Sequence, residues 1–473
     1  MTLSVAIVIA FIGELLAIIF VARILTHDAS PSTTLSWVLI ILAAPFLGLG
    51  LYYLLPRQIH IRRLRRRQNR LSWIESSLEE VREDIPAETH ADPLARLLSR
   101  LDQDAIREGN SLALLQTGRD FFEQARHAIE NAEHFVHLET YIFRPDEAGM
   151  ATLELLTAAA ARGVEVRLLY DSVGSWGLKQ RHLASLVAAG GKEAAYLRLL
   201  WRRRPFTLNF RNHRKLLVVD GHTAILGGRN IGNEYVRDRF RQTKRKWLDS
   251  MIKVEGPAVR RLHRVFIEDW YNAAEEDLAT DAYLPIIDPV GPDSVATLAT
   301  GPDQRQSRLL WVYLQMIGSA SRTIDISTPY LVPDPMVSTA LQMAAYRGVR
   351  VRVHTNGREA VNFILYRAQR SYYRALLAAG IEITETRGDY NHAKMVIVDD
   401  RYFLTGSPNT DRRSMELNFE ISVIAVDSEI CKEAAQFFVQ RLVRGREVSP
   451  DSLRSRRLGA VFDGLCRLTS PLL

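Results

Sequence analysis

The chain contains one short motif twice, and the residue types in it are suited to phosphate ester chemistry. Both copies read His-x-Lys-x4-Asp, and each is followed by an asparagine 17 residues after its histidine. The members are His213, Lys215, Asp220 and Asn230 in the first copy, and His392, Lys394, Asp399 and Asn409 in the second. Two matches with the same internal spacing indicate a duplicated half-site. Two such half-sites facing each other would form one phosphate-handling active site.

Cleavage of a phosphodiester needs three kinds of group. The ester is negatively charged and its alkoxide leaving group is poor, so a catalyst needs a nucleophile, an acid for the leaving oxygen and fixed positive charge around phosphorus. Histidine suits the first two roles because its unperturbed pKa, ~6.5, lies near working pH. The paired histidines, lysines and asparagines supply this inventory with no metal and no other cofactor.

An apolar run follows the lysine of each motif and ends at the motif's aspartate. These runs are residues 216–219 and 395–398, and they predict two strands, each closed by a tight turn. On such a strand the histidine and lysine point the same way, because side chains at i and i+2 share a face. Asp220 and Asp399 then have two interpretations, as catalytic members of the motif or as turn residues, and their position favours the turn.

The duplication extends well beyond the motifs. Residues 136–141 match residues 324–330, and residues 162–167 (Arg-Gly-Val-Glu-Val-Arg) match residues 347–352 (Arg-Gly-Val-Arg-Val-Arg). In the second pair a helix ends at glycine and a strand begins. From residue 111 onward, apolar strand-like runs alternate with helical periods, which predicts an α/β fold.

These features together resemble the phospholipase D superfamily over roughly residues 111–473, and the whole chain resembles its bacterial cardiolipin synthase family. The closer likeness rests on Trp37, Pro45, Gly48 and Tyr52, on residues 227–232 (Gly-Gly-Arg-Asn-Ile-Gly), on residues 413–420 (Arg-Ser-Met-Glu-Leu-Asn-Phe-Glu) and on the final Ser-Pro-Leu-Leu. It implies two pseudo-symmetric phospholipase D-like α/β halves that form one active site. The expected organisation is a transmembrane helical hairpin (1–56), a basic juxtamembrane segment and linker (57–110), a first half (111–285), and a second half with a C-terminal amphipathic segment (286–473).

The resemblance also implies roles for single residues. His213 is expected as the nucleophile and His392 as the general acid and base, although the pseudo-symmetry leaves the reverse order open. Asp249 and Glu420 match the carboxylates that orient the histidines in this family. The expected donors to the phosphate oxygens are Lys215, Lys394, Asn230 and Asn409.

Two apolar stretches stand at the N-terminus, residues 3–21 and 35–55. Each is close to the ~20 residues that a helix needs to cross a bilayer. A cleaved signal peptide and buried core helices are the alternatives; the first is disfavoured because no basic region precedes the first stretch.

Seven arginines lie between Arg57 and Arg70, and residues 27–34 contain no Lys or Arg. Positive charge stays inside, which predicts a multi-pass protein of the bacterial cytoplasmic membrane with a cytoplasmic catalytic body. The arginine run is also placed to bind anionic headgroups at roughly 1 kcal/mol per residue.

The formal net charge of +7 over 473 residues indicates an anionic partner, either a lipid surface or nucleic acid. The apolar N-terminus favours an anionic membrane surface.

The resemblance implies transfer of a phosphatidyl group between two phosphatidylglycerol molecules to give cardiolipin and glycerol, through a phosphatidyl-histidine. A hydrolytic phospholipase D and another headgroup-exchanging transferase remain alternatives. A nucleic-acid phosphodiesterase and an inactive scaffold are disfavoured. A homo-oligomer is left open, as is the choice between membrane contact and domain packing for the apolar positions of residues 458–473.

Overall fold

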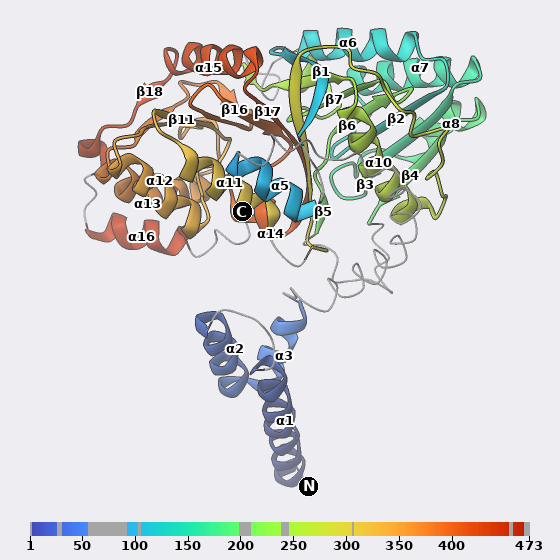
Figure 1. Cartoon of the computed structure of the whole chain (residues 1–473). Helices are drawn as coiled ribbons and strands as arrows, with labels where there is room; N and C mark the ends of the chain where they lie inside the picture. The colour runs from blue at the N-terminus through green and yellow to red at the C-terminus, as the bar shows by residue number, and fades with distance from the viewer. Residues whose placement is uncertain are drawn as a thin grey trace. The chain divides into compact units, whose positions relative to one another are not determined.

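A computed structural model describes residues 2–25, 31–54, 92–102, 106–197, 210–237, 246–304, 307–453 and 457–467. The chain divides into two compact units, residues 1–68 with 199–209, and residues 69–198 with 210–473 (Figure 1). The predicted arginine run and the final Ser-Pro-Leu-Leu lie outside the described residues.

The described part of the smaller unit is helical, and a proline interrupts its second apolar stretch. Its helices are α1 (Thr2–Leu25), α2 (Pro31–Ala43) and α3 (Pro45–Leu54). Pro45 starts α3, where the missing N–H costs nothing. A Cβ on Gly48 would lie 2.7 Å from the Cα of Ile41, so glycine is needed for α3 to close on α2. The second apolar stretch therefore lies in two helices and not in one continuous helix.

Aromatic contacts hold these helices together. The Tyr52 ring lies 5.2 Å from the Trp37 ring and 6.2 Å from the Phe20 ring, between centroids. Many other apolar side chains of α1 and α2 remain exposed. Within the part of the chain that the structure describes, no helix combines the length and the apolar character needed to span a bilayer. The two-helix transmembrane hairpin is thus not confirmed and stays a prediction.

The larger unit is built on a 16-stranded sheet that repeats one strand order twice (Figure 1). From its outer edge inward, the first half runs β4 (Lys192–Tyr196), β3 (Glu165–Asp171), β2 (Phe135–Thr140), β6 (Leu216–Val219), β7 (Thr223–Gly227), β9 (Met251–Glu255) and β1 (Arg107–Leu115). From its outer edge inward, the second half runs β18 (Arg446–Glu447), β13 (Glu382–Glu385), β12 (Arg350–Thr355), β11 (Thr323–Ser327), β15 (Met395–Val398), β16 (Tyr402–Gly406), β17 (Asn418–Val426) and β10 (Asp293–Thr300). The sixteenth strand, β5 (Arg211–Asn212), pairs with β17 off this path. Apart from β5 and the extra edge strand β18, the orders correspond one to one. The antiparallel pair β1 and β10 joins the halves, so the duplicated α/β fold is confirmed.

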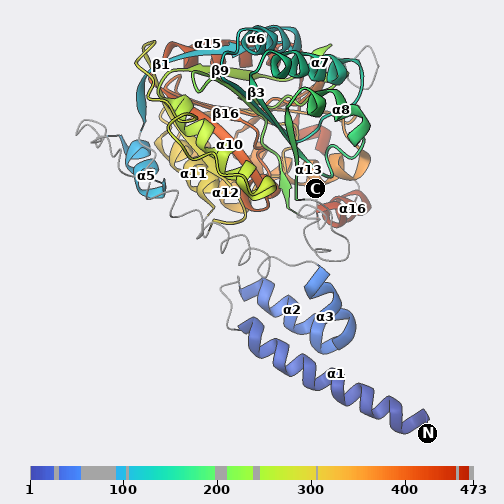
Figure 2. The same cartoon turned by 90° about the vertical axis from the view of Figure 1, so that its right-hand side faces the viewer.

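Helices cover both faces of each half (Figure 2). In the first half α6 (Gly118–Glu130), α7 (Glu147–Ala161) and α8 (Gln180–Ala188) pack into the core on one face, and α10 (Ala258–Ala274) lies on the other. Their counterparts are α11 (Arg308–Ser319), α12 (Pro335–Tyr346), α13 (Phe363–Ala378) and α15 (Glu429–Leu442). The short helices α9 (Asn233–Val236) and α14 (Arg412–Glu416) also correspond, and α5 (Pro93–Asp102), the 3-10 turn Pro450–Leu453 and α16 (Arg457–Arg467) stand outside the repeat.

The Arg-Gly-Val repeat shows why the sequence duplicates its glycines. Arg162 caps the C-terminus of α7 and Arg347 that of α12, and the next residues, Gly163 and Gly348, have φ of 94° and 89°. A residue with a Cβ is strained in this conformation, and glycine is not. Each glycine turns the chain from the helix into the next parallel strand, as predicted. The boundary between the halves near residue 285 stays a prediction.

Candidate active site

Two short parallel strand pairs bring the halves together at the histidines. β5 (Arg211–Asn212) pairs with the start of β17, and β14 (Tyr390–Asn391) pairs with β8 (Trp247–Leu248). The backbone N–H of His213 then donates to the Phe419 carbonyl at 2.9 Å, and that of His392 to the Leu248 carbonyl at 2.6 Å. The histidine segment of each half is therefore hydrogen-bonded to the acid-bearing segment of the other half.

Glu420 holds the first histidine. Its two carboxylate oxygens lie 3.0 and 3.1 Å from His213 Nδ1, and its side chain is 1 % exposed. The hydroxyls of Ser407 and Ser414 and the amide of Asn418 also donate to this carboxylate. A carboxylate at Nδ1 keeps the proton there, so Nε2 carries the lone pair.

Asp249 holds the second histidine in different surroundings. Its Oδ2 lies 2.7 Å from His392 Nδ1, and it also accepts from the Trp247 indole N–H at 3.3 Å and the Ser250 backbone N–H at 2.9 Å. The rings of Trp247 and Tyr390 lie 5.0 and 6.0 Å from the imidazole, between centroids. The sequence spacing identified both acids but did not say which histidine each would hold; the structure pairs each acid with the histidine of the opposite half.

The two lysines lie beneath the histidines. Lys215 Nζ donates to the His213 carbonyl, and Lys394 Nζ donates to the His392 carbonyl and lies 3.0 Å from His392 Nδ1. Both lysine side chains are buried. Each lysine also acts across the site, because the charge of Lys394 lowers the pKa of His213 and the charge of Lys215 lowers that of His392. The two half-sites therefore form one electrostatic unit.

Burial sets the protonation of this unit. It lowers the pKa of His213 to about 4 and that of His392 to about 3, with the lysines adding to the effect and the carboxylates opposing it. Burial also lowers the pKa of Lys394 to about 8. For Glu420 burial raises the pKa, but His213 and Lys215 outweigh it and bring it to about 2. At neutral pH the free site thus has two neutral imidazoles, each held by an ionised carboxylate.

The predicted phosphate donors differ in how far they are already engaged. The Asn230 side chain accepts from the Ile142 backbone N–H at 3.0 Å and donates to the Tyr235 hydroxyl at 3.1 Å, so it fixes neighbouring loops. The Asn409 side-chain oxygen is buried and has no hydrogen-bond partner among the described residues. Donation to a phosphate by either asparagine stays a prediction.

Asp220 and Asp399 lie at the strand-ending turns and contact backbone amides. Asp220 accepts from the backbone N–H groups of Glu133, His134 and Phe135, and Asp399 from those of residues 321–323. Both have positive φ, 50° and 56°, which aspartate tolerates better than most residues. Each aspartate ties the end of one strand to the start of its neighbour, which supports the interpretation as turn residues; a catalytic role for either stays a prediction.

Several site residues were not found in the sequence. Tyr141 lies edge-on to His213 with centroids 4.9 Å apart, and Trp247, Tyr390, Ser407 and Ser414 make the contacts described above. Trp247 stands two residues before Asp249 and Tyr390 two before His392, on the same faces of their short strands. This i, i+2 spacing is the sequence signal that could have identified Trp247 and Tyr390 as site residues. The contacts of Ser407 and Ser414 depend on tertiary structure and left no such signal.

Comparisons with known proteins agree with the duplicated architecture. The family model described as cardiolipin synthase, phospholipase D-like domain, matches residues 125–270 and 313–442, one segment in each half. The model described as phospholipase D-nuclease N-terminal matches residues 15–55. The cardiolipin synthase of Geobacillus sp. (strain WCH70) is 33 % identical over 470 residues, which cover 97 % of this chain and 92 % of that protein. Cardiolipin synthase 2 of Bacillus anthracis is 31 % identical over 459 residues, with 95 % and 88 % covered.

One solved structure resembles the larger unit. The crystal structure of phosphatidylserine synthase from Haemophilus influenzae Rd KW20 has a TM-score of 0.60 and covers 80 % of this chain and 97 % of that one. Its sequence identity is 16 %, so the likeness concerns the fold alone.

Proposed function

Because this chain belongs to the cardiolipin synthase family of the phospholipase D superfamily, we propose that it joins two phosphatidylglycerol molecules into cardiolipin and releases glycerol. The observation that carries the proposal is the crossed pairing at the site. Each histidine has Nδ1 held by a carboxylate of the other half, at 3.0 Å for His213 and 2.7 Å for His392. This leaves two Nε2 atoms for a nucleophile and a proton carrier.

In the first step, His213 Nε2 attacks the phosphorus of one phosphatidylglycerol. The bond from phosphorus to the glycerol headgroup breaks, and the departing oxygen takes a proton from His392 Nε2. Both imidazoles are neutral in the free site, so each could attack, and the family resemblance assigns the nucleophile to His213. The bound phosphodiester brings a negative charge that raises the pKa of His392, which supplies the protonated acid.

In the second step, a glycerol hydroxyl of another phosphatidylglycerol gives its proton to His392 Nε2. Its oxygen attacks phosphorus, the bond from phosphorus to nitrogen breaks, and cardiolipin leaves with His213 neutral again. Water in place of the hydroxyl would give phosphatidic acid, so exclusion of water from the site decides between transfer and hydrolysis.

Fixed positive charge and N–H donors stabilise the charge that develops on the phosphate oxygens. Burial lowers the pKa of both Lys215 and Lys394, and the charges of Asp249 and Glu420 raise it again, which supports the charged form of the lysines in this role. The remaining donors are Asn230 and Asn409.

The smaller unit associates with the bacterial cytoplasmic membrane, and the larger unit lies on the cytoplasmic side. Exposed apolar side chains on α1, α2 and α3, such as Phe11, Ile18, Leu39 and Leu47, support the association. The seven arginines between Arg57 and Arg70 support the orientation. The two crossings predicted from the sequence are the finer part of this proposal, and protease treatment of spheroplasts and of inverted vesicles tests it. Only the inverted vesicles should expose the larger unit.

The decisive experiment uses the purified full chain in vesicles of phosphatidylglycerol alone. We expect cardiolipin and glycerol in equal amounts, and phosphohistidine in the acid-quenched protein. Phosphatidic acid as the only lipid product would replace the synthase with a hydrolase. Label on His392 would reverse the two histidine roles and leave the reaction in place. A protein with both His213→Ala and His392→Ala is the matched control and should form neither product.

A further inference from the structure

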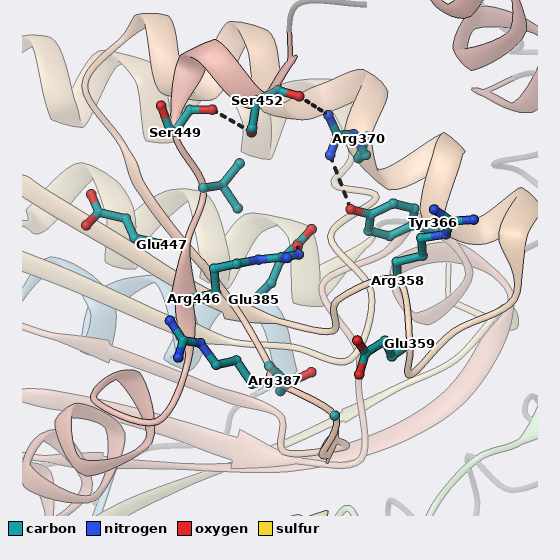
Figure 3. Close-up of a pocket in the computed structure, with 13 residues that line it drawn as sticks. Arg358, Glu359, Tyr366, Arg370, Glu385, Arg387, Arg446, Glu447, Ser449 and Ser452 are labelled. Atoms are coloured by element: carbon teal, nitrogen blue, oxygen red, sulfur yellow. Dashed lines mark hydrogen bonds and ion pairs between the residues drawn. The ribbon is translucent and has the colours of Figure 1, made fainter.

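The second half contains a cavity of about 900 Å³ lined by four arginines and three glutamates (Figure 3). Its walls come from the loop after β12, the first half of α13, the loop after β13, and the segment that follows β18. None of the histidines or lysines of the active site lines it. The arginines are Arg358, Arg370, Arg387 and Arg446, and the glutamates are Glu359, Glu385 and Glu447.

The charges of this arginine cavity are only partly neutralised. Arg446 pairs with the buried Glu385 at 2.8 Å. Arg370 is held by neutral partners, the Tyr366 hydroxyl at 3.2 Å and the Ser452 carbonyl at 2.7 Å (Figure 3). No described residue forms a hydrogen bond or ion pair with the exposed side chains of Arg358 and Arg387.

Apart from the Arg446–Glu385 pair, the cavity wall thus contains three guanidinium groups and two carboxylates. The excess of one positive charge matches a phosphodiester monoanion, which guanidinium groups bind through paired N–H donors. The carboxylate of Glu447, which also lines the cavity, is an acceptor for hydroxyl groups. A glycerol phosphodiester headgroup carries both the anion and the hydroxyls.

An apolar ridge begins on the same helix that lines the cavity. Phe363 and Ile364 in the first turn of α13, and Val461, Phe462 and Leu465 on α16, are between 41 % and 63 % exposed. α16 is fixed on α13, because Arg367 pairs with Asp463, donates to the Gly459 carbonyl at 2.9 Å and covers the rings of Phe363 and Phe462. The sequence left membrane contact and domain packing open for this segment. α16 packs on α13 through Phe462 and Asp463 and leaves Val461 and Leu465 exposed.

The cavity wall is also connected by hydrogen bonds to β14, the strand that directly precedes His392. Thr386, which lines the cavity, accepts from the Gly357 backbone N–H and donates to the side chain of Asn356. That side chain in turn bonds both the N–H and the carbonyl of Asn391, each at 2.7 Å, and Asn391 directly precedes His392. A ligand in the cavity therefore lies against a wall that is hydrogen-bonded to the active-site strand.

We propose that the α13–α16 face docks on an anionic lipid leaflet, with the apolar ridge among the acyl chains and a glycerol phosphodiester headgroup in the arginine cavity. Apolar side chains beside arginines are the combination that lies at a bilayer interface, where each part meets its own environment. The headgroup bound here is not the one being cleaved, so the site is a second lipid site. The identity of that lipid rests on the proposed function, while the docking itself does not.

Hydrogen exchange of the full chain in nanodiscs tests the docking without any turnover. We expect backbone amides of residues 358–370 and 457–467 to exchange at least about 5-fold more slowly in phosphatidylglycerol discs than in phosphatidylcholine discs, since roughly 1 kcal/mol per interfacial charge corresponds to this factor. The Arg358→Gln/Arg387→Gln protein should lose that difference. The Arg119→Gln/Arg126→Gln protein, which loses two exposed arginines of α6, should keep it.

Three results would overturn the proposal: equal exchange in the two kinds of disc, the same loss in the control protein, or slowing by inorganic phosphate alone in an uncharged detergent. The last result would make the cavity a site for free phosphate. The Val461→Ser/Leu465→Ser protein tests the ridge, and should lose protection in both kinds of disc. Val187→Ser/Met343→Ser, on α8 and α12, is its matched control and should lose none.

Turnover in mixed micelles separates this inference from the proposed function. In the Arg358→Gln/Arg387→Gln protein the half-saturating mole fraction of phosphatidylglycerol should rise about 30-fold with kcat within about 2-fold, since two interfacial charges contribute about 5-fold each. A fall in kcat at an unchanged half-saturating mole fraction would show that the cavity serves the chemistry, which contradicts a docking site. If the wild-type chain makes no cardiolipin, the proposed function fails and the exchange experiment still decides the docking.

Discussion

The two half-sites share one backbone plan and differ in what surrounds the acid. Around Glu420 the neighbours are polar: two serine hydroxyls and an asparagine amide donate to the same carboxylate that holds His213. Around Asp249 the Trp247 indole N–H and one backbone N–H donate, and the rings of Trp247 and Tyr390 lie near His392, whereas the Tyr141 ring lies edge-on to His213. A duplication that began symmetric has therefore kept the histidine and acid and changed the donors.

This difference fits a division of labour between the histidines. A nucleophile must stay neutral and fixed, and the dense hydrogen-bond network of Glu420 fixes His213 from behind. A proton carrier must change charge twice in each cycle, and His392 has the carboxylate of Asp249 at 2.7 Å to pair with the imidazolium when it forms. The comparison thus favours His213 as the nucleophile, the order that the family resemblance implies.

The strongest test of the comparison uses substrates with different leaving groups. We expect His213→Ala and His392→Ala each to reduce cardiolipin synthesis by about 10⁴-fold or more. A phosphatidyl ester of p-nitrophenol needs no acid for its departure. With this substrate His392→Ala should recover a burst of nitrophenol equal to the enzyme concentration, because the phosphoenzyme forms and then waits, and His213→Ala should not. The reverse pattern would exchange the two roles and contradict the argument from the surroundings.

The acids should show the next largest effect, and an unequal one. Glu420→Gln and Asp249→Asn each remove the charge that holds one imidazole, and we expect kcat to fall about 10²- to 10⁴-fold in both. Glu420→Gln should also lower the free energy of unfolding more, by about 1–3 kcal/mol, since it leaves one of three other buried donors without an acceptor. Steady-state kinetics and urea unfolding measure the two quantities. Equal stability loss in both proteins would show that the richer network around Glu420 contributes nothing.

The pairing of each histidine with the acid of the other half is the part of the site that the sequence alone does not predict. His213 and His392 were predicted from the repeated spacing of their motifs, and Asp249 and Glu420 from the family resemblance. The repeat also fixed the α/β class and the paired halves, because such spacing is local in the sequence. The pairing of His213 with Glu420, 207 positions apart, could not be predicted, because it depends on how β5 meets β17. The break at Pro45 was likewise hidden, because an apolar run predicts burial and not the direction of the chain.

The same substitution, Asp to Asn, can be compared at the turn residue Asp220 and at the active-site residue Asp249. Asn tolerates positive φ, so Asp220→Asn tests the carboxylate without straining the backbone. We expect it to lower the free energy of unfolding by about 1–2 kcal/mol, since three backbone N–H groups share that carboxylate. Its kcat should stay within about 3-fold of wild type. Asp399→Asn is the counterpart in the second half and should behave alike; a 100-fold loss of kcat in either protein would support the catalytic role.

The smallest effect expected is in the pH dependence of stability, where the two histidines should behave alike. An unfolded imidazole titrates near ~6.5, and burial lowers the pKa of folded His213 to about 4 and of His392 to about 3. Between these values the unfolded chain binds more protons, so stability is complete above pH ~6.5 and falls as the pH decreases. His213→Asn and His392→Asn should each reduce the slope of unfolding free energy against pH by up to about 1.4 kcal/mol per pH unit.

Measurement between pH 5 and 6.5 separates this effect from the acids. Glu420 has a pKa lowered to about 2, so its contribution is lost only as the pH falls from about 4.5 toward that value, below the window. An unchanged slope in one histidine variant would mean that this imidazole already carries a proton in the folded protein. If that imidazole were His213, the neutral nucleophile would be lost and the division of labour with it. If it were His392, the general acid would be charged before substrate arrives. The two histidines would then differ in charge as well as in their neighbours.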